Sequence, residues 1–353
     1  MDIPANASFV ETLRSFTDPE PDLEGASVLV TGGTGSFGQE IVKTLLARFS
    51  LRKLIVFSRD EMKQYEMQLR FPVEQHDCMR FFIGDVRDRD RLELAMREVD
   101  YVIHAAALKH VPAAEYNPFE CINTNVYGAE NVVQAALRTG VKKVIALSTD
   151  KAANPVNLYG ASKLASDKIF VAANNLSGTL GTRFAVVRYG NVAGSRGSIV
   201  PYFRKLIADG AAELPITDER MTRFWITLPQ GVNFVLSSLS MSVGGEIFVP
   251  KIPSVRIVDL ASHMAPAAGH KIIGIRPGEK IHEVMITSDD SRDTVELDDR
   301  YIIRPRPVDN MVTAAAWDDL PPVSEEFQYA SNTNHEWLKN EAIDMLLGAV
   351  SDG

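Results

Sequence analysis

Short apolar runs alternate with amphipathic segments through the first half of the chain. The stretch "ASVLVTGGTGSFG" is an apolar run that ends in a glycine cluster, and "QEIVKTLLARF" then carries apolar residues at helical spacing. Further runs rich in Val and Ile predict strands within 53–60, 79–88, 100–110, 141–150 and 182–192. Helices are predicted within 61–71, 89–99, 117–140 and 159–175, the third ending at Gly140. Nearly continuous apolar strands that alternate with helices predict an α/β fold, a Rossmann-type doubly wound parallel sheet.

The alternation of predicted strands and helices changes after Asn191, where Gly, Pro and charged residues become more frequent. One more helix at 229–242 and a strand at 245–250 are predicted to return to the sheet. We therefore expect a Rossmann domain from 1–190 with 226–250, and a smaller α/β domain from 191–225 and 251–353. The N-terminal "MDIPANASFVETLRSF" is predicted to be a short capping helix.

Composition narrows the functional class. The chain has 353 residues and a formal net charge of −9, which argues against a general nucleic-acid binder because such a protein needs a basic face. Two cysteines, Cys78 and Cys121, are too few for a disulfide framework and fit reduced thiols in a cytoplasmic protein. The N-terminus lacks the apolar core of a secretory signal, and no apolar run approaches a membrane-spanning length.

The glycine cluster predicts a dinucleotide site. "TGGTGSFG" fits G-x-G-x-x-G at Gly33, Gly35 and Gly38, and also G-x-x-G-x-x-G from Gly32, Gly35 and Gly38. Glycines let the backbone approach a pyrophosphate, and the helix that follows offers N–H donors. Thr34, Ser36 and Phe37, which lie between the glycines, are included in the predicted site.

The end of the second strand bears on the choice of cofactor. An NAD site places an acidic residue about 20 residues past the glycines, and here that region holds Ser58 and Arg59, with Lys63 one helical turn on. A hydroxyl and two cations suit a 2′-phosphate, so NADP is predicted. Asp60 follows directly and keeps NAD as an alternative.

The ends of the next two strands complete the predicted cofactor site. Asp85 and Val86 are expected to contact the adenine, although Asp85 fits the cap of the following helix equally well. Ala105 and Ala106, at the end of the 100–110 strand, are assigned to the same site.

A catalytic segment follows in "STDKAANPVNLYGASK". Tyr159 and Lys163 are four residues apart and share a helix face. A tyrosine with an ordinary pKa near 10 is a poor base at neutral pH. We expect the Lys163 cation and a positive nicotinamide ring to lower that pKa. Thr149 ends the fifth strand, where its hydroxyl can share the substrate proton.

Several stretches together carry a family resemblance over about residues 26–290. They are "TGGTGSFG", "SRDEMKQ", "FFIGDVRD", "HAAALKHVPAAEYNP", "ALSTDKAANPVNLYGASK", "RYGNVAGSRGS", "RMTRFWIT" and "IRPGEKIHEVMI". The chain resembles an extended short-chain dehydrogenase/reductase, and more narrowly the inverting UDP-N-acetylglucosamine 4,6-dehydratases of bacterial nonulosonic-acid and surface-glycan pathways, such as those that lead to pseudaminic acid. Related retaining sugar dehydratases would show Thr-Asp-Glu where this chain has Thr149, Asp150 and Lys151.

The resemblance implies a lyase, a hydro-lyase that transiently reduces NADP. Tyr159 would take the proton of the sugar 4-hydroxyl, neutral Lys151 the proton at C5, and protonated Asp150 would assist departure of the C6 hydroxyl. The product would be UDP-2-acetamido-2,6-dideoxy-β-L-arabino-hexos-4-ulose. Burial is expected to push both Asp150 and Lys151 toward their neutral forms, and which of the two removes H5 stays open. The resemblance also implies a UDP-sugar substrate and a homo-oligomer, with a hexamer as one form.

Six residues are candidates for the substrate side. Lys109 follows the fourth strand, Asn191 and Arg196 follow the sixth, and three further candidates lie in the smaller domain: Arg223, Arg276 and Glu279. An Asn can bind an acetamido group or a diphosphate oxygen, an Arg a diphosphate, and a Glu a ribose. The alternatives are a helix-start cation for Lys109 and a surface or interdomain ion pair for the others. No spacing predicts a metal site.

Two other functions remain to be weighed. A UDP-sugar 4-epimerase would use the same Tyr159 and Lys163 but needs no acid and base for C5 and C6, so the Asp150–Lys151 pair argues against it. A non-catalytic NADP-binding sensor would not need the Tyr and the Lys that are both present here.

Overall fold

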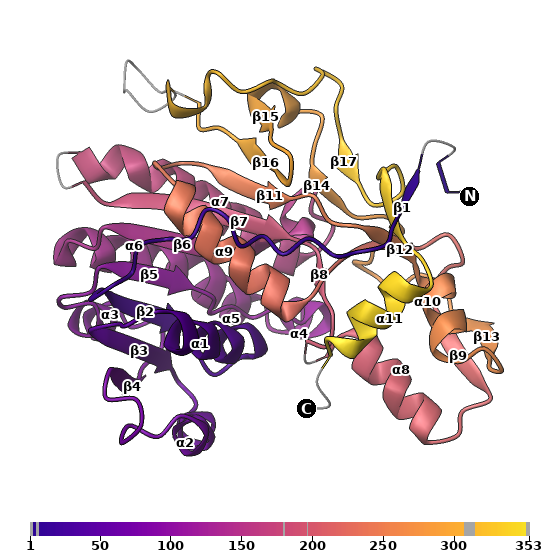
Figure 1. The fold of residues 1–353 in the computed structure, drawn as a ribbon, viewed down its shortest axis with the longest axis horizontal. Coiled ribbons are helices and arrows are strands. Elements are labelled where there is room, and N and C mark those ends of the chain that lie inside the picture. The colour runs from indigo at the N-terminus through magenta and orange to yellow at the C-terminus, as the bar shows by residue number, and fades with distance from the viewer. Residues whose placement is uncertain (1–2, 5–6, 179–180, 196, 307–314, 351–353) are drawn as a thin grey trace.

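A computed structural model describes residues 3–4, 7–178, 181–195, 197–306 and 315–350. A nine-stranded sheet forms the larger body (Figure 1). Its seven parallel strands run in the order β4, β3, β2, β5, β6, β7 and β11. Their bounds are Met79–Ile83, Lys53–Ser58, Ser27–Thr31, Tyr101–His104, Lys143–Thr149, Arg183–Tyr189 and Ile247–Pro250. The predicted doubly wound parallel sheet is confirmed, because every predicted strand, including the returning one, takes its place in it.

Helices cover both faces of this sheet, which is why its strands are apolar almost throughout. α1 (Ser36–Arg48) and α9 (Leu228–Met241) pack together on one face, while α6 (Gly128–Thr139) packs against α3 (Arg89–Ala95) and α7 (Leu158–Ser177) on the other. α2 (Glu61–Arg70) contacts the edge strand β4 and its neighbour β3. Most core side chains of strands and helices form one large hydrophobic cluster.

The helix predicted at 117–140 is divided into distinct parts. α5 (Pro118–Ile122) leads into a π-helical turn at Asn123–Tyr127, and α6 continues to Gly140, whose φ of 73° ends the helix in the left-handed conformation. The turn buries Asn125, whose side chain hydrogen-bonds both Leu108 backbone groups, at 2.8 and 2.9 Å. The irregular turn therefore fixes the loop after β5, just before α4 (Val111–Tyr116).

A smaller body adjoins the carboxyl ends of the parallel strands. Its five-stranded sheet has the order β1, β18, β12, β10 and β8, with bounds Ser8–Val10, Glu336–Leu338, Ser254–Arg256, Thr222–Ile226 and Asn191–Val192. A second hydrophobic cluster joins it to α8 (Ile199–Ala208), α10 (Ile257–Met264) and α11 (Glu341–Gly348). The strand pair β9 (Glu213–Ile216) and β13 (Gly269–Ile272) completes it. A second pair, β14 (Val284–Ile286) and β17 (Tyr329–Ala330), lies at the junction of the two bodies, with Met285, Ile286 and Tyr329 in the large cluster.

Two expectations about the chain's organisation are corrected. The N-terminus forms strand β1, not a capping helix, because its backbone pairs with β18. From there the segment runs along α9 to β2 (Figure 1), with side chains of Gln230, Asn233 and Ser237 donating to carbonyls of residues 14, 15 and 18. β16 (Arg300–Ile303) pairs antiparallel with β11, and β15 (Thr294–Glu296) pairs antiparallel with β16, so both extend the large sheet and 251–353 is not wholly part of the smaller body.

Short 3-10 turns lie at Asp150–Ala152, Ser291–Asp293 and Ala315–Trp317. Within the described ranges, no helix is both long and apolar enough to cross a membrane.

Candidate active site

The glycine turn after β2 leaves room for a ligand against the backbone. Gly32 has a φ of +66°, and a Cβ there would lie 2.8 Å from the backbone nitrogen of Ala106. A Cβ on Gly38 would meet the backbone of Gly33 at 2.5 Å, so this glycine lets α1 approach the turn. Gly35 is the residue before α1 and donates to the Gly32 carbonyl at 3.0 Å. The spacing Gly32, Gly35, Gly38 therefore marks the close approaches, and the bare helix start fits a dinucleotide phosphate.

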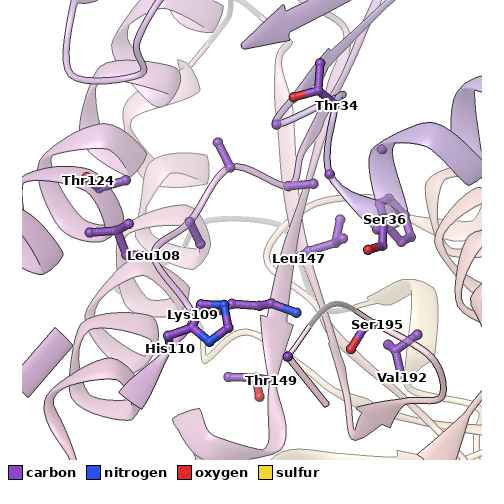
Figure 2. Close-up of a pocket in the computed structure, with 18 of the residues that line it drawn as sticks. Thr34, Ser36, Leu108, Lys109, His110, Thr124, Leu147, Thr149, Val192 and Ser195 are labelled. Carbon is purple, nitrogen blue, oxygen red and sulfur yellow. The ribbon is translucent and has the colours of Figure 1, made fainter. Parts of the chain in front are cut away.

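A cavity of about 710 Å³ extends from this turn to the ends of β6 and β7. Figure 2 shows Thr34, Ser36, Leu147, Thr149 and Lys109 around it. Every residue predicted to contact the cofactor lines this cavity: Gly32, Thr34, Gly35, Ser36, Phe37, Gly38, Ser58, Arg59, Asp60, Lys63, Asp85, Val86, Ala105, Ala106, Tyr159 and Lys163. The structure thus brings the predicted cofactor residues together.

At the end of β3 the acidic residue is already engaged. Asp60 caps α2 by accepting from the Lys63 backbone N–H at 3.0 Å, and the Lys63 ammonium lies 2.8 Å from its other oxygen. These hydrogen bonds lower the pKa of Asp60. The Ser58 hydroxyl accepts from Gln64 at 3.0 Å, whereas the Arg59 side chain is 56% exposed. Arg59 lies 3.7 Å from Asp85 Oδ2 and is still largely exposed to a ligand, whereas Asp60 has a structural role.

The helix-cap interpretation of Asp85 is wrong. Asp88 caps α3, accepting from the Arg91 backbone N–H at 3.0 Å. Asp85 instead accepts from the Arg87 side chain at 2.7 and 3.0 Å. Burial raises the pKa of Asp85, but the Arg87 hydrogen bonds outweigh burial and the pKa is lowered. Asp85 is thus an ionised acceptor at the cavity wall.

Tyr159 lies in the first turn of α7, which Asn157 caps by accepting from the Gly160 N–H at 2.8 Å. Burial raises the pKa of Tyr159 to about 12, against the opposing effects of the Lys151 charge and a hydrogen bond with Thr149. The buried Lys163 ammonium donates to the Leu147 carbonyl at 2.6 Å. The expected lowering of the tyrosine pKa by Lys163 is therefore not seen in the protein alone, where Lys151 is the cation that acts on Tyr159.

The Asp150–Lys151 pair occupies the 3-10 turn after β6. Asp150 is fully buried, and its Oδ1 accepts from the Thr149 hydroxyl at 2.9 Å and from Lys151 Nζ at 3.1 Å. Its Oδ2 meets no hydrogen-bond donor among the described residues. The pair adjoins the cavity, which Lys151 lines beside Tyr159.

A second carboxylate that sequence reasoning missed faces the same amine. Glu283, just before β14, places Oε1 3.4 Å from Lys151 Nζ. Burial lowers the pKa of Lys151, but Asp150 and Glu283 outweigh burial and raise it above its ordinary value. The expectation that burial makes Lys151 neutral is thus corrected, because the two anions hold its proton. The stretch "IRPGEKIHEVMI" was the sole sequence signal, and nothing in it singled out Glu283.

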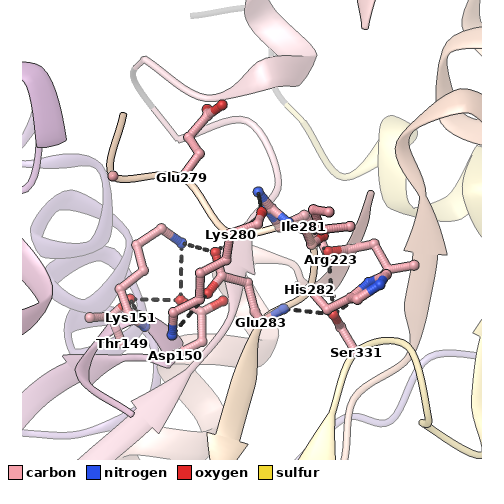
Figure 3. Close-up of polar contacts among 12 residues, drawn as sticks. Thr149, Asp150, Lys151, Arg223, Glu279, Lys280, Ile281, His282, Glu283 and Ser331 are labelled. Atoms are coloured by element: carbon pink, nitrogen blue, oxygen red, sulfur yellow. Dashed lines mark hydrogen bonds and ion pairs between the residues drawn. The ribbon is translucent and has the colours of Figure 1, made fainter. Parts of the chain in front are cut away.

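The substrate-side candidates separate into three groups. Lys109 and Asn191 line the cavity. Arg223 lies behind it, donating to carbonyls of residues 222, 281 and 280 at 2.7, 3.0 and 2.9 Å, which fits the interdomain alternative. Arg276 and Glu279 lie on a loop outside the cavity lining, 4.0 Å apart, and Glu279 points away from the cluster around Lys151 (Figure 3). Arg196 lies outside the described residues.

Within the described part of the chain, no three His, Cys, Asp or Glu side chains are grouped so that they could hold a metal ion. The parallel sheet, the glycine turn and the Thr149–Tyr159–Lys163 constellation define an extended short-chain dehydrogenase/reductase.

Comparison with known proteins gives the family. The chain belongs to the polysaccharide biosynthesis protein family, which matches residues 28–305. It is 58% identical to the UDP-N-acetylglucosamine 4,6-dehydratase (inverting) of Campylobacter jejuni strain 81-176, over 91% of this chain and 97% of that protein. It is 42% identical to the UDP-glucose 4-epimerase of Rickettsia canadensis, over 78% of this chain and 82% of that one. The resemblance to inverting dehydratases is confirmed.

Solved structures agree with the fold. Pen from Bacillus thuringiensis superposes with a TM-score of 0.84 at 35% identity, over 93% of this chain and 98% of that one. DesIV, a dTDP-glucose 4,6-dehydratase from Streptomyces venezuelae solved with NAD bound, gives a TM-score of 0.63 at 25% identity, over 80% and 93% of the two chains. A structural neighbour thus binds a nicotinamide dinucleotide.

Proposed function

We propose that this protein is a UDP-N-acetylglucosamine 4,6-dehydratase that inverts C5 and releases UDP-2-acetamido-2,6-dideoxy-β-L-arabino-hexos-4-ulose. The observation that carries the proposal is the buried Asp150–Lys151 pair, whose 3.1 Å hydrogen bond adjoins Tyr159 at the cavity. The 58% identity to an inverting dehydratase over 91% of the chain supports the same activity.

The first step needs Tyr159 as a base toward the C4 hydroxyl. Its pKa of about 12 means that the phenol is neutral in the protein alone. A nicotinamide cofactor, when bound, supplies a hydride acceptor for C4, a positive ring beside the phenol, and later the hydride for C6. The Lys151 charge opposes the effect of burial and favours the phenolate. The Thr149 hydroxyl, at the end of β6, helps to pass the proton.

The second step is elimination across C5 and C6. Along the 3.1 Å hydrogen bond the Lys151 ammonium gives its proton to Asp150, which produces a neutral amine and a carboxylic acid. The amine then takes H5, the C5–H electron pair forms the C5–C6 double bond, and the C6–O bond breaks as Asp150 protonates the leaving oxygen to give water. The pair ends as ammonium and carboxylate, the state from which the step began, so it is ready to act again.

We propose NADP as the cofactor. Arg59 is 56% exposed at the cavity wall and Lys63 lies beside it, while Asp60 is engaged in capping α2. A cation that is open to a ligand suits a 2′-phosphate, whereas an engaged carboxylate is a poor partner for ribose hydroxyls.

The alternative is a UDP-sugar 4-epimerase, which the 42% identical relative is named. Epimerisation at C4 uses Tyr159 and Lys163 and leaves C5 and C6 untouched. It gives no role to a fully buried carboxylate hydrogen-bonded to Lys151, so the dehydratase is favoured. A sensor without turnover would likewise leave this buried pair without a function.

The test is to incubate the protein with UDP-N-acetylglucosamine in D2O and follow the product by NMR. A 4-keto-6-deoxy product with deuterium at C5 and inverted configuration supports the proposal. A 4-hydroxy epimer indicates the epimerase, retained configuration indicates a retaining dehydratase, and binding without turnover indicates the sensor. Tyr159→Phe is the negative control, because it removes the phenolic oxygen that takes the first proton.

We further propose a cytoplasmic homo-oligomer whose substrate cleft lies between the two bodies. Free Cys78 and Cys121 support a reducing compartment. Two aromatic side chains at the junction of α4 and α5 are largely exposed, Tyr116 by 87% and Phe119 by 80%. Such exposure supports the proposal that a second copy covers this surface.

A further inference from the structure

Glu283 is a buried anion that the proposed chemistry has not yet used. Its side chain is 2% exposed, and its Oε1 lies 3.4 Å from Lys151 Nζ across the junction between the two bodies. Its Oε2 finds no hydrogen-bond donor in the described part of the chain. Burial of a carboxylate costs several kcal/mol unless cations and donors offset it. Glu283 is therefore a buried carboxylate beside the proposed base, and neighbouring cations must offset its desolvation.

The smaller body fixes the direction of this carboxylate before any substrate arrives. Arg223 Nε lies 3.7 Å and Lys280 Nζ 3.9 Å from Glu283, and the Glu283 backbone N–H donates to Ser331 Oγ at 2.9 Å. Arg223 also holds the carbonyls of residues 280 and 281, just before Glu283. Figure 3 shows these side chains gathered around Glu283, between the smaller body and the turn that carries Lys151.

The charges in the elimination step show what such an anion can do. When Lys151 takes H5, positive charge grows on its amine. Asp150 is protonated at that moment and becomes an anion only as its proton passes to the leaving oxygen. Glu283 is the second carboxylate within 4 Å of Lys151 Nζ, and its charge stabilises the developing ammonium.

We propose that Glu283 is a positioning residue for Lys151, holding the amine beside Asp150 and stabilising the ammonium that forms when the amine takes the C5 proton. This inference rests on the proposed dehydratase function. It assigns to the smaller body a part in the acid–base chemistry as well as in substrate binding, because Arg223 of that body holds Glu283 beside the base.

The pH dependence follows from the charged groups that face Lys151. These are Asp150, Glu283, Arg223, Lys280 and Tyr159. The active state carries one proton on the Asp150–Lys151 pair, and activity ends at alkaline pH when that proton is lost. Glu283 favours the ammonium and so raises the pKa of Lys151. Loss of the Glu283 charge therefore lowers the Lys151 pKa, and the alkaline limb of the kcat profile moves to lower pH.

The experiment is a comparison of Glu283→Gln, Glu283→Asp and the unaltered protein. For Glu283→Gln we expect kcat for dehydration to fall at least about tenfold, a smaller loss than the roughly 10²–10⁴-fold of removing an acid–base group. The alkaline limb of the kcat profile moves to lower pH by about one unit or more, and KM changes little. Glu283→Asp keeps the charge, so it should recover part of kcat and part of the shift of the alkaline limb.

A matched control separates this role from mere structure. Glu246→Gln neutralises another fully buried carboxylate, one that accepts from Val243, Gly244 and Trp317 away from the cavity. It is expected to lower the melting temperature and leave the kcat profile in place. Unchanged kcat in Glu283→Gln, or a lower kcat with an unmoved alkaline limb, overturns the inference. Failure of the unaltered protein to form a 4-keto product overturns the proposed function instead.

Discussion

The glycine turn and the acid–base cluster adjoin one cavity but are built from the chain in opposite ways. The turn is made by neighbours in sequence, Gly32 to Gly38, and its critical distances are set by the backbone. The cluster joins Asp150 and Lys151 to Glu283, more than a hundred residues further on and at the junction with the smaller body. A site built from sequence neighbours can thus be recognised as a motif. A site assembled across the junction of the two bodies leaves no such motif.

The largest expected effect comes from the cluster. Lys151→Ala removes the amine that takes H5, so dehydration should fall by about 10²–10⁴-fold, as measured by formation of the 4-keto product. Transient reduction of the cofactor should survive, with its pH dependence moved upward, because the Lys151 charge lowers the pKa of Tyr159. Lys168→Ala, an exposed change on α7, is the control. Full activity in Lys151→Ala would show that the base is wrongly assigned.

The glycine turn should respond through cofactor affinity and stability. Gly32→Ala places a Cβ 2.8 Å from the Ala106 nitrogen at a φ of +66°. Gly25→Ala is a matched control, because its φ is +64° and its Cβ would meet no atom within 4 Å among the described residues. Both variants should lose about 1 kcal/mol of stability to backbone strain, and Gly32→Ala should also bind the cofactor more weakly. If titration calorimetry gave the same cofactor affinity for Gly32→Ala and Gly25→Ala, Gly32 would not be needed for close approach of the cofactor.

The smallest effect concerns cofactor choice at the edge of the cavity. Arg59→Ala removes an exposed cation and should weaken NADP by about 10- to 100-fold, the range of a charged hydrogen bond, with little effect on NAD. Arg97→Ala, which removes an exposed cation of α3's C-terminal flank, is the control for net charge. Equal losses for NADP and NAD, measured by fluorescence titration, would remove the argument for a 2′-phosphate site.

The sequence predicted structure that depends on neighbouring residues and failed where distant segments meet. The seven parallel strands of the large sheet and the glycine turn were predicted in place, because period and spacing record local geometry. Strand β1 was misjudged as a helix because its pairing partner, β18, lies more than three hundred residues away. Arg223 was predicted to reach a diphosphate, but the chain carbonyls that it binds belong to residues 280 and 281, whose position no local pattern records.

The sequence by itself determined the order of strands and helices, the dinucleotide turn and the presence of Tyr159, Lys163, Asp150 and Lys151, because each depends on residues that are close together in the chain. The tertiary structure alone decided the protonation of Lys151. Burial by itself would have favoured the neutral amine, but the fold places two carboxylates 3.1 and 3.4 Å from it. Electrostatic energy depends on distance in space, and that distance is settled only when the two bodies meet.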